Sequence, residues 1–125
     1  MLARYQIVRG RRPPENPLPQ GVRVDIRKHT RHVLAPDPKS VERYLAAPDD
    51  RAWKHFRAAY LALLEQRFAA EPEPFVALAA QAMETDVHLG CNCPTAKNPD
   101  VHRCHTVVAL EFMHARFPRL EVRMP

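Results

Sequence analysis

The stretch from residue 53 to residue 68 constrains the fold more than any other part of the chain. Its large apolar residues recur at spacings of three and four, which is the period of one face of an α-helix; they are Trp53, Phe56, Tyr60, Leu63, Leu64 and Phe68. The helix is predicted to start at Asp49 or Asp50 and to end before Glu71-Pro72-Glu73-Pro74. Such a stripe must be buried against other elements, so we interpret it as core and not as a cofactor site.

Three further helices are predicted on either side of this one. Asp37 followed by Pro38 is typical of a helix start, because Asp accepts from the free amides and Pro suits the first turn. That helix ends at Pro48. A third helix is expected over 75–84, and a fourth contains the apolar residues of 107–117.

Short apolar runs predict strands at 4–8, 22–26, 87–91 and 120–124. The order of elements predicts an α/β fold: a single small domain over residues 1–125, with a short, mostly parallel sheet of about four strands covered by about four helices. A chain of 125 residues with 46% hydrophobic residues suits one core. The four prolines in 10–21 exclude a helix there and predict a surface loop.

The net charge of +5 is unevenly distributed along the chain. Residues 1–32 contain eight Lys or Arg against two acidic residues, whereas the remainder has eleven bases against twelve acids. A basic segment of this kind attracts nucleic acid, phosphorylated small molecules or acidic surfaces. Few aromatic residues accompany it and no nucleic-acid motif is present, so a small anionic ligand is favoured over nucleic acid.

The first ten residues resemble neither a signal peptide nor a membrane anchor, because Arg4 and Gln6 interrupt their apolar run. We therefore expect a cytoplasmic protein without a membrane partner. In a reducing compartment, an odd number of clustered cysteines indicates a thiol or metal role before it indicates disulfides.

All three cysteines lie in 87–106, the segment that follows the predicted third strand. In parallel α/β sheets, ligands bind beyond the carboxyl ends of the strands. Two segments leave strands there, 25–29 and 91–105. We therefore expect any chemistry of this protein at that edge.

Three groups of residues resemble a known family: Val24-Asp25-Ile26-Arg27, the run from Trp53 to Leu61, and Cys91 followed by Cys104-His105. Over about residues 20–117 the chain is similar to the domain of unknown function 488 (DUF 488) family, which has Asp-x-Arg, Phe-Arg-x-x-Tyr and Cys-His-Arg in this order. Thr106 replaces the last Arg, which leaves Arg103 as the nearby guanidinium. The resemblance implies the same α/β fold and a site at the carboxyl edge.

One hypothesis for this site is a thiol pocket. Cys104 and His105 are the candidate catalytic residues: a thiol at the positive end of a helix ionises readily and acts as a nucleophile, and a histidine exchanges its proton. Asp25, Arg27, Arg103 and Thr106 are the candidate ligand-binding residues. Arg27 would hold a small anion together with the free amides of the last helix, and Asp25 would orient Arg27 by a bidentate pair.

The alternative hypothesis is a structural zinc site made of Cys91, Cys93, Cys104 and His102, with His105 as another possible ligand. Such a module would serve protein or nucleic-acid interaction. The start of the last helix distinguishes the two hypotheses. If Asp100 caps that helix, residues 102, 104 and 105 point in different directions at ~100° per residue. If the helix starts at Thr106, His102 and Cys104 lie on one side of a loop and a metal site is feasible.

Overall fold

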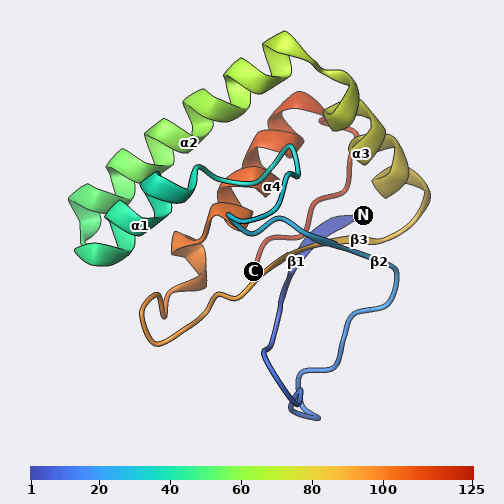
Figure 1. The fold of residues 1–125 in the computed structure, drawn as a ribbon. Coiled ribbons are helices and arrows are strands. Elements are labelled where there is room, and N and C mark those ends of the chain that lie inside the picture. The colour runs from blue at the N-terminus through green and yellow to red at the C-terminus, as the bar shows by residue number, and fades with distance from the viewer.

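The computed structural model describes residues 1–125 as three strands and four α-helices (Figure 1). The strands are β1 (Leu2–Gln6), β2 (Val22–Asp25) and β3 (Val87–Cys91), and the helices are α1 (Pro38–Ala46), α2 (Asp50–Ala70), α3 (Glu73–Glu84) and α4 (His105–Arg116). One 3-10 turn, η1 (Val101–Arg103), lies between β3 and α4. The α/β class predicted from the sequence is confirmed.

Two of the helices start at the residues that their capping signals predict. The Asp37 carboxylate accepts a hydrogen bond from the Ser40 backbone N–H at 3.0 Å, and Asp49 accepts from the Ala52 N–H at 2.7 Å. Helix α3 starts two residues earlier than predicted, at Glu73. Pro74 is tolerated there because the first turn of a helix needs no donor from that residue.

The sheet has the strand order β1-β3-β2, and both pairings are parallel. Cys91 at the end of β3 is paired with Gln6 at the end of β1, and Gly90 is paired with Asp25 at the end of β2. All three strands therefore end at the same edge of the sheet. The segments that follow β2 and β3 both leave from this edge.

The prediction of about four strands is wrong by one, because residues 120–124 form no strand. This segment makes only an isolated parallel bridge between Val122 and Leu2. Leu120 is buried in the core and Val122 packs against it. The apolar alternation that predicted a strand there therefore reflects side-chain packing and not a run of ladder hydrogen bonds.

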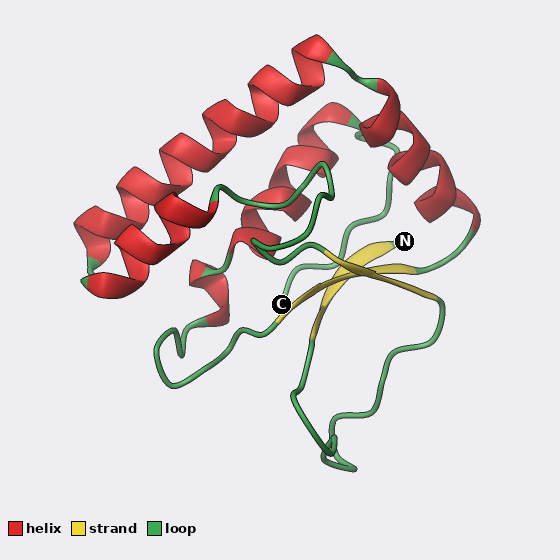
Figure 2. Cartoon of the chain, in the orientation of Figure 1, coloured by secondary structure: helices red, strands yellow, loops and turns green.

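The helices form two layers over the sheet. Helix α4 contacts β1 and β3 directly, and α2 packs on α4 with α1 beside it. Phe56, Tyr60 and Leu64 of α2 are buried, which confirms that the stripe is core. The loop between β1 and β2, which includes the predicted Pro-rich segment, extends away from the helices (Figure 2). None of the helices combines the length and the apolar character needed to cross a membrane.

Candidate functional site

A cavity of about 240 Å³ lies where β2 and β3 end and α4 begins. Its wall includes all three cysteines, His105 and Asn98. Four basic side chains also line it, those of Arg27, Lys28, Lys97 and Arg103, and no carboxylate does. The cavity therefore combines thiols with basic side chains. Three of these, Arg27, Lys28 and Arg103, pair with carboxylates that lie outside it, those of Asp25, Glu42 and Asp50.

The sulfur atoms of Cys91, Cys93 and Cys104 lie within 4.8 Å of one another. All three residues are free thiols. Cys91 and Cys93 are half-buried, whereas Cys104 is only 2% exposed. A reagent must therefore enter the cavity to reach the sulfur of Cys104.

Helix α4 starts between the two positions that the sequence leaves open, a start capped by Asp100 and a start at Thr106. The Asp100 carboxylate accepts from the backbone N–H of His102 at 3.0 Å, but it caps the 3-10 turn and not the helix. Cys104 is the N-cap of α4, with an extended backbone (φ −111°, ψ 144°), and the helix begins at His105. Cys104 thus occupies the junction between the loop and the helix.

His102 lies apart from the three thiols. Its side chain is exposed, and its ring nitrogens lie 3.2 Å from Asp100 Oδ1 and 3.4 Å from the carbonyl oxygen of Pro125. The structure therefore brings together three of the four ligands of the predicted zinc site, and His102 is not among them.

His105 has a fixed orientation next to Cys104. Its Nε2 lies 2.8 Å from the carbonyl oxygen of Ile26, which can only accept, so Nε2 carries the proton and donates. Nδ1 is then an acceptor, and it lies 3.8 Å from Cys104 Sγ. Burial lowers the pKa of His105 to about 4. A neutral imidazole therefore presents its basic nitrogen to the thiol.

The three thiols are not equivalent. Hydrogen bonds from the thiols of Cys91 and Cys93 lower the pKa of Cys104 well below its usual value, and Thr106 contributes through its hydroxyl and its backbone N–H. The pKa of Cys91 is raised, chiefly by its hydrogen bond to Cys104. The pKa of Cys93 is raised as well, so Cys104 is the thiol of this cluster whose pKa is lowered.

Arg27 is held in place by Asp25, as predicted. Its Nε and Nη2 donate to the two carboxylate oxygens of Asp25 at 3.0 and 2.8 Å, and its backbone N–H donates to the same side chain. This pairing with Arg27 lowers the pKa of Asp25. Asp25 itself does not line the cavity. It orients the arginine that does.

Thr106, predicted as a ligand-binding residue, is fully buried beneath the site and does not line the cavity. Its hydroxyl accepts from Arg4 Nε at 2.9 Å, and Arg4 Nη2 donates to the carbonyl oxygen of Cys93 at 2.6 Å. Arg4 thus ties β1 to α4 and to the cysteine loop. Sequence reasoning missed this role. The signal was that Arg4 lies two residues after the core residue Leu2, on the same face of the strand, where an arginine is unusual.

Asn98 is a second residue that the sequence did not single out. Its side chain is buried, and its Nδ2 donates to Cys93 Sγ at 3.3 Å and to the carbonyl oxygen of Arg103 at 2.9 Å. Asn98 therefore joins the two ends of the loop that carries the thiols. Its only signal in the sequence is its place in the loop between two cysteines.

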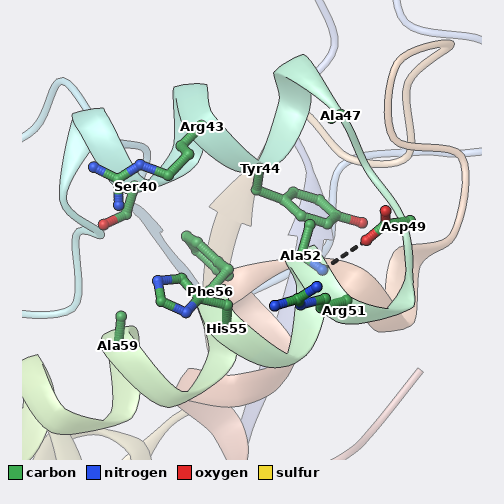
Figure 3. A pocket seen from close by; sticks show the side chains of 10 residues that line it. All are labelled: Ser40, Arg43, Tyr44, Ala47, Asp49, Arg51, Ala52, His55, Phe56 and Ala59. Carbon is green, nitrogen blue, oxygen red and sulfur yellow. Dashed lines mark hydrogen bonds between the residues drawn. The ribbon is translucent and has the colours of Figure 1, made fainter.

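A second cavity, of about 380 Å³, lies between α1 and α2 (Figure 3). Tyr44 and Phe56 line both this cavity and the one at the cysteines. It contains no thiol, and the carboxylate of Asp49 at its rim is occupied as the cap of α2. The cavity between α1 and α2 therefore lacks the thiols that distinguish the cysteine cavity.

Comparison with known proteins places the whole fold in one family. A family model described as "Active DUF488-N3 subclade" matches residues 3–117, which include every strand and helix residue except Leu2. No curated protein and no solved structure matches the chain significantly. The resemblance inferred from the Asp-x-Arg, aromatic-helix and Cys-His segments is confirmed, and the chain belongs to the DUF488 family.

Proposed function

We propose that the protein binds a small anion in the cysteine cavity and that Cys104 attacks it as a nucleophile. The observation that carries this proposal is the wall of the cavity, where three clustered thiols face four basic side chains and no carboxylate. Arg27, Lys28 and Arg103 each pair with a carboxylate outside the cavity, so the positive charge without an ion-pair partner at the wall is that of Lys97. Positive charge in a concave site raises the local concentration of anions. Free thiols suit a reducing compartment, so we propose a cytoplasmic location.

Each proposed role corresponds to a contact in the site. Arg27, oriented by its pair with Asp25, presents a guanidinium for an oxyanion. His105 Nδ1, 3.8 Å from the sulfur, faces the Cys104 thiol as a hydrogen-bond acceptor. Lys28 and Lys97 add charge at exposed positions of the wall. The site therefore contains a nucleophile, a neutral imidazole beside it and an anion-binding group.

This proposal predicts that alkylation of Cys104 depends on the charge of the reagent. Iodoacetate is an anion and iodoacetamide is neutral, and both transfer a group of similar size to sulfur. The ratio of their rate constants at Cys104 should be higher than at a small free thiol. The double substitution Lys28→Ala/Lys97→Ala should lower this ratio about tenfold at low salt, because electrostatic attraction changes encounter rates by this order. Peptide mass spectrometry of labelled protein gives the rate at each cysteine.

The matched control is Lys39→Ala/Arg43→Ala, which removes two exposed charges from α1 outside the cysteine cavity. It should leave the ratio unchanged. Added salt should lower the ratio of the wild-type protein, because it screens exposed charges. The proposal would be contradicted if the wild-type protein and both double variants had the same ratio of iodoacetate to iodoacetamide rate constants. Faster labelling of Cys91 and Cys93 than of Cys104 would also contradict it.

Metal binding is a second candidate function, favoured by the three sulfur atoms within 4.8 Å of one another. Ligands of a tetrahedral zinc ion with Zn–S bonds of ~2.3 Å lie ~3.8 Å apart, so small side-chain movements would let three thiolates bind one ion. The fourth position would face the cavity. A module of this kind would serve protein or nucleic-acid interaction.

This second function predicts about one zinc ion per chain in untagged, purified protein, measured by elemental analysis. Cys104→Ser should abolish zinc binding, whereas His102→Ala should not, because His102 lies apart from the thiols. A chelator should release the ion and expose the three thiols to alkylation. Protein free of metal with freely reacting thiols would exclude this function and leave the first one.

A further inference from the structure

The two thiols next to Cys104 differ in how they are held. Cys91 ends β3: it is paired with Gln6, and its carbonyl oxygen accepts from the Ile7 N–H at 2.9 Å. Cys93 lies beyond the end of the strand, in the loop. Asn98 Nδ2 donates to its sulfur at 3.3 Å, a contact that stabilises negative charge on that atom. Cys93 therefore lies outside the ladder of the sheet and has a hydrogen-bond donor for its thiolate, while Arg4 Nη2 holds its carbonyl oxygen at 2.6 Å.

We propose that Cys93 is a resolving thiol and that the substrates of this site are small anions with an electrophilic sulfur atom. Attack by Cys104 gives a mixed disulfide, and attack by Cys93 on that adduct gives an internal Cys93–Cys104 disulfide. The proposal rests on the proposed function of Cys104 as a nucleophile. It adds the chemical class of the substrate and a role for the second thiol.

The chemistry balances for tetrathionate, a dianion with a central sulfur–sulfur bond. Cys104 Sγ bonds to one inner sulfur, the central bond breaks, and thiosulfate leaves with the electron pair. Cys93 Sγ then bonds to Cys104 Sγ, and a second thiosulfate leaves in the same way. Both thiol protons pass to solvent. Two thiols are oxidised to one disulfide and one tetrathionate is reduced to two thiosulfates.

The geometry needs only local movement for the second step. The sulfur atoms start within 4.8 Å of each other, and a disulfide bond is ~2.05 Å long. Rotation of side chains and a small shift of the loop at Cys93 can close this gap. Cys91 has less freedom because its backbone belongs to the central strand of the sheet. The loop thiol is therefore the better placed of the two.

The test is a reaction of the full chain with tetrathionate, followed by intact-mass and peptide analysis. Wild-type protein should lose two hydrogen atoms, retain no adduct and contain a Cys93–Cys104 disulfide. Cys93→Ser should release one thiosulfate and keep the other on Cys104. Cys91→Ser, the matched control for the choice of resolving thiol, should react more slowly because Cys104 loses a hydrogen bond from the Cys91 thiol, but it should still end with a Cys93–Cys104 disulfide and no adduct. Cystamine, a cationic disulfide, should react at least about tenfold more slowly than tetrathionate, because the wall repels it.

The outcomes separate this inference from the proposed function. A wild-type rate in Cys104→Ser would overturn the nucleophile itself. A stable adduct on Cys104 of the wild-type protein, or a Cys91–Cys104 disulfide, would leave the nucleophile and overturn the role of Cys93. Equal rates with cystamine would overturn the anionic substrate class. Mapping the disulfide in the wild-type protein decides the resolving thiol even if a variant folds poorly.

Discussion

Replacing Phe112 with alanine should lower the free energy of unfolding by about 3–5 kcal/mol, because it deletes a large buried ring and leaves a cavity. The side chain is 3% exposed. Its ring centroid lies 5.6 Å from that of Phe75 and 6.1 Å from that of Phe68. These contacts join α4 to α3 and α2. Domains of this size are stable by about 5–15 kcal/mol, so the variant should lose a large share of its stability.

Urea denaturation followed by circular dichroism measures this change. The matched control is Met83→Ala on α3, because Met83 is 59% exposed and has little contact to lose. It should change the free energy of unfolding by no more than about 0.5 kcal/mol. If both variants lost the same free energy of unfolding, the packing of Phe112 against Phe68 and Phe75 would not be what stabilises the contact between these helices. Because α4 carries Cys104 at its start, the Phe112 variant should also react less selectively at that thiol.

Acidification should destabilise the protein, and His105 alone should account for about 3 kcal/mol between pH 6.5 and pH 4. Burial lowers the pKa of His105 from 6.5 to about 4 in the folded state, whereas the unfolded chain keeps the ordinary value. In this window the unfolded state binds a proton that the folded state does not. The stability present above the unfolded pKa is therefore lost progressively as the pH falls. Burial also lowers the pKa of His32 and His88, which adds to the loss.

Urea denaturation at several pH values measures the slope. His105→Gln keeps a donor for the Ile26 carbonyl but cannot titrate, so this variant should show a much flatter dependence on pH. The control is His114→Gln, an exposed position on the same helix, which should keep the wild-type slope. An unchanged slope in His105→Gln would contradict the buried, neutral state of this ring.

Local signals in the sequence were enough for most of the secondary structure. Asp37 and Asp49 start helices because a carboxylate next to free amides acts within a few residues. The stripe of α2 is buried because its spacing places Phe56, Tyr60 and Leu64 on one face. The same reasoning misjudged residues 120–124, because buried apolar side chains alternate there without a partner strand along their length.

The amino-acid sequence by itself therefore determined the helices, the existence of the three strands and the place of the cysteines after β3, because capping and periodicity act over short distances. The first strand was misplaced by two residues: β1 lies at Leu2–Gln6 and not at 4–8. Only the tertiary structure decided which side chains meet there. Packing α4 on the sheet brought Cys104 to Cys91 and Cys93, and it left His102 outside. The contact of Arg4 with Thr106 spans about a hundred positions of the chain. No local pattern encodes such a contact, because it depends on how the elements pack.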